Sequence, residues 1–216
     1  MKKILISIFA LLFSYSMANA AVNIGISMSA GGFTASGTED EAGEKSTEDA
    51  AGAASYGSIF IEKTLGEKIT LGFDYVPSSL DTETTETIVD DIQDKSETAR
   101  TQRTNTVKAS FTDLTTLYVN FNVNENLYLK FGRATVDVST KESLATGSSY
   151  GDADMDGSVM GFGYHNQFDN GMFVRFEGQY MDLGGFTLTS ENNSDNKVTL
   201  DDLQGVAGAI KIGKSF

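Results

Sequence analysis

The sequence has no cysteine and no tryptophan, and it contains only one histidine and one proline among 216 residues. The lack of cysteine excludes disulfides, thiolate metal sites and cysteine nucleophiles together. Basic residues are also scarce, because 16 Lys and Arg stand against 30 Asp and Glu, which gives a net charge of −14. Nucleic-acid phosphates are bound through Lys and Arg. We therefore expect no nucleic-acid partner.

Long hydrophobic runs are missing beyond the N-terminus, where no stretch reaches the ~18 consecutive apolar residues of a spanning helix. The N-terminus itself has a basic end at Lys2 and Lys3, an apolar segment over 4–13 and an A-x-A site at 18–20. This pattern predicts a secretory signal peptide over residues 1–20 and a mature domain over residues 21–216. Without the two lysines the mature net charge becomes −16. A membrane location would then require a β-barrel.

Alternation of apolar and polar residues is the strongest pattern that is present. In the last stretch, GVAGAIKIGKSF, Val206, Ile210 and Ile212 share one parity with Phe216, and small residues with Lys211 occupy the other. Side chains of a strand point alternately to its two faces, so this pattern predicts a strand with one apolar face. Similar patterns predict strands over 21–32, 55–63, 68–76, 107–123, 127–138, 158–168, 172–180 and 205–216.

The connections between these strands alternate in length. We expect short turns centred on residues 66, 125 and 170, and long polar loops over 34–54, 77–106, 139–157 and 184–202. An even number of strands with short turns on one side and long loops on the other is typical of outer-membrane barrels. The predicted fold class is all-β: an eight-stranded antiparallel transmembrane up-and-down β-barrel.

Three local features are expected within this frame. Ile88 and Ile92 favour a short helical turn in the second long loop. Asp113 falls on the apolar parity and is expected above the membrane edge, where a charge costs less. The parity slips after Phe131, which predicts a β-bulge near Gly132.

Three segments carry a family resemblance: residues 56–77, 126–134 and 159–185. In the last, a glycine-alternating strand and a tight turn precede an Arg-x-Glu strand that ends in Tyr-x-Asp. Together they resemble the OmpA-like, opacity-type family of eight-stranded proteins of the Gram-negative cell outer membrane. The resemblance implies a structural or surface-interaction role, such as envelope integrity or adhesion-type contact through acidic extracellular loops.

The same resemblance implies partners. They are outer-membrane lipid and lipopolysaccharide, and the barrel assembly machinery, which would read the C-terminal strand that ends in Phe216. We expect a monomer. The closing strand should pair with the first strand in antiparallel fashion, with Phe216 facing lipid and Lys214 reaching the interface at the rim.

A soluble barrel of the lipocalin type is the alternative fold, because alternation does not say which face points inward. The Gly-x-Trp motif near the lipocalin N-terminus is absent, since there is no Trp. The signal peptide, the asymmetric loops and the terminal Phe favour the membrane barrel.

In a membrane barrel the polar parity fills the lumen, and its charges must pair because they are removed from water. The glycines of this parity, Gly25, Gly72, Gly161 and Gly163, would leave room for long charged chains. Since an eight-stranded interior is only wide enough for side chains, a salt-bridged plug is favoured over an ion path. A narrow porin for ions or small solutes is the alternative function. The expected interior charges are Glu62, Asp74, Lys108, Lys130, Arg175, Glu177 and Lys211.

No catalytic, cofactor-binding or metal site is predicted, and we expect no enzyme. His165 could serve a lipid A-modifying barrel enzyme, but its lumen parity favours an interior histidine near the periplasmic end. Asp152, Asp154 and Asp156 match the first half of a calcium loop, whereas its twelfth position is Gly163 instead of Glu. Weak binding of divalent cations by these acidic loops is left open.

Overall fold

The computed structural model describes residues 21–216 except 42, 92–100 and 145–146, so the predicted signal peptide lies outside the described residues. The described chain is almost entirely β-structure. Its strands are β1 (Val22–Glu41), β2 (Glu44–Leu65), β3 (Ile69–Tyr75), β4 (Leu80–Asp81), β5 (Thr85–Asp91), β6 (Thr101–Asn122), β7 (Leu127–Ser143), β8 (Ala153–Gln167), β9 (Met172–Thr189) and β10 (Asn196–Ser215).

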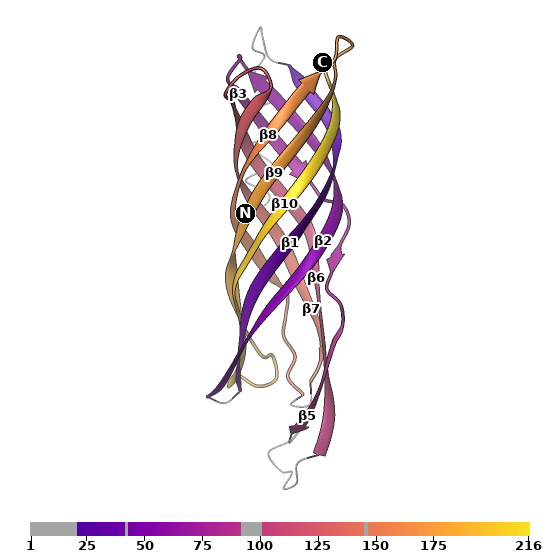
Figure 1. Ribbon diagram of the computed structural model, residues 1–216. Coiled ribbons are helices and arrows are strands. Elements are labelled where there is room, and N and C mark those ends of the chain that lie inside the picture. The colour runs from indigo at the N-terminus through magenta and orange to yellow at the C-terminus, as the bar shows by residue number, and fades with distance from the viewer. Residues whose placement is uncertain (1–20, 42, 92–100, 145–146) are drawn as a thin grey trace.

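Neighbouring strands pair antiparallel in chain order, and the sheet closes where β10 pairs with β1 and β3 pairs with β6. Strands β3, β4 and β5 all pair with β6 and are successive pieces of one barrel strand, interrupted after Tyr75. The ring therefore has the eight antiparallel strands that the sequence predicts. Figure 1 shows the C-terminus at the end with the short turns and the long hairpins at the other end.

The closure between the last and the first strand is made as expected. The Val22 amide donates to the Phe216 carbonyl at 3.1 Å, and the Phe216 amide donates to the Val22 carbonyl at 2.9 Å. The Phe216 side chain is 72% exposed on the outer face. Lys214 lies beside it, with Nζ 5.4 Å from the ring centroid. The end of the chain thus completes the barrel wall.

The wall has an apolar outer face and a polar inner face. Ile26, Phe162 and Val206 are 62%, 66% and 63% exposed, whereas Glu62 and Lys211 are 0% and 1% exposed. A soluble barrel would have the opposite arrangement, so this inversion excludes the lipocalin alternative and is typical of a membrane barrel. Among the described residues, no helix is long and apolar enough to span a membrane.

Most of the predicted long loops are wrong, because the strands continue through them. Residues 34–54 form a β-hairpin in which β1 and β2 pair without a register shift up to Glu41 and Glu44. The turn contains Gly43, whose φ is 98°. This part of the chain has no apolar face. It is held by backbone pairing, by the hydrogen bond between the Thr38 and Thr47 hydroxyls at 2.9 Å, and by the Lys45–Asp40 ion pair. Likewise, β7 and β8 extend into 139–157, and β9 and β10 extend into 184–202.

The predicted helical turn in the second long loop is also wrong. Ile88 lies in β5, where it pairs with Thr104 of β6, and Ile92 lies outside the described residues. Long-range pairing with β6 determines the local conformation here. The four-residue spacing of the two isoleucines carries no information about that pairing.

The predicted bulge at Gly132 is wrong as well. The pairing of β7 with β6 and with β8 continues through Gly132, and the irregularity falls on β6, between Thr112 and Thr115. Asp113 lies at that bulge with a φ of 55°. Its side chain is exposed, as expected, and Oδ1 accepts a hydrogen bond from the Tyr75 hydroxyl at 2.9 Å. The apparent slip in β7 arises because the lumen itself becomes apolar beyond Gly132.

Candidate functional site

The lumen is filled by two successive groups of side chains, which we call the ionic layer and the apolar layer. The ionic layer lies closer to the short turns and receives charged side chains from five strands. Because each strand points alternate residues inward, members far apart in the sequence meet at one level. Its charged members are Glu62, Asp74, Lys130, Arg175, Glu177 and Lys211. All six were predicted to face the interior.

Glu62 and Arg175 form the first centre of this layer. Arg175 Nη1 lies 2.6 Å from Glu62 Oε1 and 2.8 Å from Oε2. The carboxylate also accepts hydrogen bonds from the Tyr118 hydroxyl at 2.8 Å and from Asn23 Nδ2 at 3.1 Å. Both oxygens of this fully buried carboxylate are therefore satisfied by charge-assisted and neutral donors.

Glu177 is the second centre. It accepts hydrogen bonds from Lys130 Nζ at 3.0 Å and from the Tyr128 hydroxyl at 2.5 Å. Lys211 Nζ lies 3.4 Å from Glu177 and 3.0 Å from Asp74, so it finds acidic partners as expected. Three acids and three bases thus neutralise one another. Such mutual pairing is what allows six charges to remain in an interior removed from water.

Lys108 does not belong to the ionic layer, which corrects the prediction. Its Nζ donates to Asp81 Oδ2 at 2.8 Å on the exposed side of β6. The bulge at Asp113 explains the error, because one extra residue moves every side chain beyond it to the opposite face of the sheet. Phe111 consequently packs against the interior cluster, while Lys108 turns away from it.

Three of the four inward glycines make room for aromatic rings instead of charged chains, whereas Gly161 faces the Gly178 carbonyl and Gln179. A Cβ added at Gly72 would meet the ring of Tyr118, and one at Gly163 would meet the ring of Tyr128. Each tyrosine lies directly opposite its glycine on the neighbouring strand. Gly25 similarly faces the Phe60 ring. The cross-strand Gly–Tyr pairs are the signal that sequence reasoning missed, because the register between strands was not yet known.

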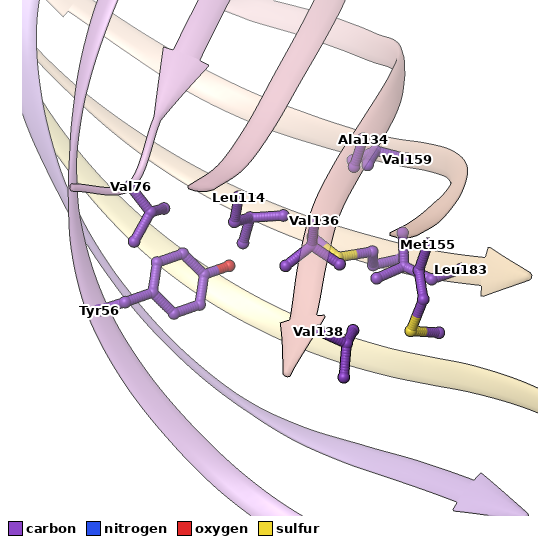
Figure 2. Close-up of a cluster of buried hydrophobic side chains, with 10 residues drawn as sticks. Tyr56, Val76, Leu114, Ala134, Val136, Val138, Met155, Val159 and Leu183 are labelled. Atoms are coloured by element: carbon purple, nitrogen blue, oxygen red, sulfur yellow. The ribbon is translucent and has the colours of Figure 1, made fainter. Parts of the chain in front are cut away.

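The apolar layer occupies the lumen beyond the ionic layer. Figure 2 shows its side chains converging inside the barrel, and Val136, Met155 and Val159 are only 1–2% exposed. Sequence reasoning did not predict it, because alternation was taken to mean a polar interior throughout. The members are Tyr56, Val76, Leu114, Ala134, Val136, Val138, Met155, Val159, Met181 and Leu183.

A cavity of about 20 Å³ remains where the two layers meet, lined by Ser27, Tyr56 and Lys211 among others. This volume suffices for about one water molecule. The buried Ser27 hydroxyl, which has no partner in the protein, could bind such a water. Side chains of the ionic layer and of the apolar layer, such as Lys211 and Tyr56, together line this cavity.

His165 lies inside the barrel, as predicted. Its Nδ1 accepts a hydrogen bond from Arg175 Nε at 2.8 Å. Its ring packs against Phe173 with centroids 5.2 Å apart. The imidazole therefore supports Arg175 from the side of the short turns.

The three aspartates of the calcium-like motif do not form a loop. Asp154 and Asp156 belong to β8, and Asp156 is bonded to Arg133 of β7. Within the described part of the chain, no group of three His, Cys, Asp or Glu residues could hold a metal ion. The strand conformation separates ligands that a calcium loop would gather.

The long hairpins form the other candidate surface. The segments 34–54, 77–106, 139–157 and 184–202 carry net charges of −5, −4, −3 and −3, nearly all of the −16 that residues 21–216 carry. Asp81 is an example of an acidic residue in these segments whose carboxylate accepts hydrogen bonds from neighbouring side chains. Hydrogen bonds from Lys108 and Ser110 lower its pKa below the ordinary value of 3.8.

These features define the class: a small outer-membrane β-barrel with a filled lumen. No family model and no curated protein matches the chain. Among solved structures, the outer membrane protein OprG from Pseudomonas aeruginosa is similar at 12% identity, with 91% of this chain and 96% of that chain covered and a TM-score of 0.59. The outer membrane protein AlkL, determined in DMPC bilayers, shows 12% identity, coverage of 94% and 92%, and a TM-score of 0.54.

This likeness establishes the fold. Together with the apolar outer face, the fold confirms the predicted location in the outer membrane.

Proposed function

We propose that the protein is a closed outer-membrane barrel that acts through its extracellular hairpins, as a surface-contact and envelope component. The observation that carries this proposal is the filled lumen. A neutral ionic layer and an apolar layer follow one another, and the cavity between them has a volume of only about 20 Å³. A narrow porin would need a wetted path, so this packing supports the closed barrel over the porin.

The hairpins support a role in contact. β1 and β2 continue as a paired ribbon to Glu41 and Glu44, far beyond the apolar belt. An ordered acidic ribbon presents charge at a fixed position, and it favours partners of positive charge while repelling like surfaces. We also propose that the protein is similar in role to the opacity-type proteins. We further propose that the protein has no enzymatic role, since Nδ1 of His165, the candidate catalytic residue, accepts a hydrogen bond from Arg175.

Shortening one hairpin tests the surface role. Residues 38–47 carry a net charge of −3, and Asn-Gly can replace them because this dipeptide closes a two-residue hairpin. Cells that display the full chain should attach to a polylysine-coated surface more strongly than cells that display the shortened chain. Attachment to a polyglutamate-coated surface serves as the control. Equal attachment of both cell types to polylysine would refute the contact role.

A second candidate function is the capture of small apolar molecules. The apolar layer extends toward the hairpin end through Phe33, Leu80 and Phe186, which are partly buried against it. An apolar fluorescent probe such as N-phenylnaphthylamine should then bind to the refolded barrel, and Val136→Asp should weaken its binding. Unchanged probe binding in that variant would dismiss this candidate.

A further inference from the structure

The half of β2 that lies toward the hairpin tip, Glu44 to Ser58, is an open sheet edge. From Leu65 to Ile59, β2 lies between β1 and β3. From Ser58 outward to Glu44 it pairs, within the described residues, with β1 alone. Strands β4 and β5, on the other side of this gap, pair only with β6. Figure 1 shows the β1–β2 and β5–β6 hairpins diverging toward their tips.

The register identifies which backbone groups are unpaired. The Thr64 amide donates to the Ala21 carbonyl at 2.9 Å, and the β1–β2 register continues from there without a shift. In an antiparallel pair, alternate residues direct their N–H and C=O groups to the same neighbour. Even-numbered residues of β2 therefore bond to β1. Odd-numbered residues in this half, such as Asp49, Ala51 and Ala53, direct theirs to the open edge.

The middle of this edge lacks the usual protection. Residues 45–53 are exposed, and residues 50–54 read AAGAA, with no charge and no proline. Natural proteins normally blunt a free edge with charged residues, proline or a bulge, because its unpaired groups are a template for another strand. An exposed edge with small side chains is open to strand addition by an extended peptide.

Charge selects the occupant. The hairpin that carries the edge has a net charge of −5 over 34–54. Across the gap, Asp81, Glu83 and Glu86 are exposed. A second copy of the chain, with its own mature charge of −16, would be repelled. A segment rich in Lys or Arg would be attracted.

We propose that an extended cationic peptide segment of a partner protein binds by adding a strand to β2 at residues 47–55. This inference rests on the proposed function, because it names the partner class of that contact surface. Main-chain hydrogen bonds to the odd-numbered residues provide the docking geometry, and the acidic side chains provide the preference for positive charge.

Amide hydrogen exchange on the full mature chain, refolded in detergent micelles, tests the binding mode. The probe is a synthetic peptide of alternating Lys and Val. Without peptide, the amides of Asp49, Ala51 and Ala53 should exchange fast, and those of Ala50 and Gly52 slowly. With peptide, the odd-numbered amides should become protected. Protection that is absent, or is spread equally over both sets, would overturn the proposal.

Proline substitutions supply the matched variants. Ala51→Pro and Ala53→Pro each remove an outward N–H and leave the bonds to β1 in place. Each should weaken peptide binding about two- to tenfold, the effect of one hydrogen bond. Ala51→Thr and Ala53→Thr keep the N–H and should bind like the wild type. A peptide of alternating Lys and Pro has the same charge and fewer donors, and it should bind more weakly than the Lys-Val peptide.

The two proposals fail separately. Wild-type affinity in both proline variants, with folding verified by gel mobility, would reject strand addition even if cells attach to polylysine. Unchanged attachment after hairpin shortening would reject the contact role, whatever the exchange experiment shows.

Discussion

At the scale of single residues, the barrel interior depends on buried charges that are completely paired. Glu62 is 0% exposed and receives Arg175, Tyr118 and Asn23. A carboxylate in this setting is stable only while its partners remain. Removing one member of the network therefore leaves the other as an uncompensated buried charge.

Glu62→Gln should lower the free energy of unfolding by about 3–5 kcal/mol, because Arg175 would lose its anionic partner. Urea unfolding in detergent micelles, followed by circular dichroism, measures this loss. The control is Asp156→Asn, which breaks the pair with Arg133, whose side chain is 64% exposed. That change should cost less than about 1 kcal/mol. Equal losses in the two variants would contradict the paired-charge account.

Gly72→Ala should destabilise the barrel by about 1–3 kcal/mol, because the new methyl group would collide with the Tyr118 ring. Gly57→Ala is the control, since its methyl group would meet nothing closer than the Ser27 carbonyl at 3.7 Å. The double variant Gly72→Ala/Tyr118→Leu should recover part of the loss. No difference between the two alanine variants in urea unfolding would show that the ring can move aside.

Residue-level prediction from the sequence worked where only parity mattered. It correctly placed Glu62, Arg175 and Lys211 in the lumen, because lipid on one face imposes strict alternation. It failed for Lys108, because the bulge at Asp113 reverses the parity of β6. A lone bulge residue leaves little trace in a single sequence.

At the scale of strands, the segments that cross the apolar belt were predictable and their extensions were not. β1 was expected to end near Gly32, yet it continues to Glu41. Beyond Phe33, which packs against the apolar layer, the extension consists of small and polar residues with no apolar period, so periodicity does not mark them. Their pairing follows from the neighbouring strand, which a single segment does not reveal.

The short strand β4 should detach from β6 on acidification. The Asp81 carboxylate accepts hydrogen bonds from Lys108 and Ser110, which lowers its pKa below the ordinary value of 3.8. Because the folded-state pKa is depressed, this stabilisation is present above the unfolded pKa and is lost as pH falls through the folded one. The Thr82 amide donates to the Ala109 carbonyl at 2.9 Å. Between about pH 6 and about pH 3, its exchange rate should rise relative to the exchange rates of the amides that pair β6 with β7.

Asp81→Asn is the control for this acid response. Asn cannot lose a charge, so the relative exchange of the Thr82 amide should be the same at both pH values. An acid response that persists in Asp81→Asn would assign the effect to another group.

At the scale of the whole molecule, strand count, strand order and ring closure all followed from the sequence. The alternation of short and long connections fixes an up-and-down order, and an even number of strands lets β10 return to β1. The division of the lumen into an ionic and an apolar layer did not follow. This division depends on which inward residues lie at the same level along the barrel axis. Finding those residues requires the register of every strand pair.

A folded barrel of this kind should resist detergent at room temperature, because at the level of β3 every strand of the ring has two hydrogen-bonded neighbours. The mature protein in dodecyl sulfate should therefore migrate faster in a gel when it is not boiled than after boiling. Identical migration in both samples would argue against a stable membrane barrel.

Conductance of the purified mature protein in planar lipid bilayers tests the central claim most directly. The proposed closed lumen rests on the ionic layer, the apolar layer and the cavity of only about 20 Å³ where they meet. We predict insertion of the protein, verified by its recovery from the bilayer lipid, with no stable conductance steps at either polarity. Large and reproducible steps from the wild-type protein would contradict the closed barrel.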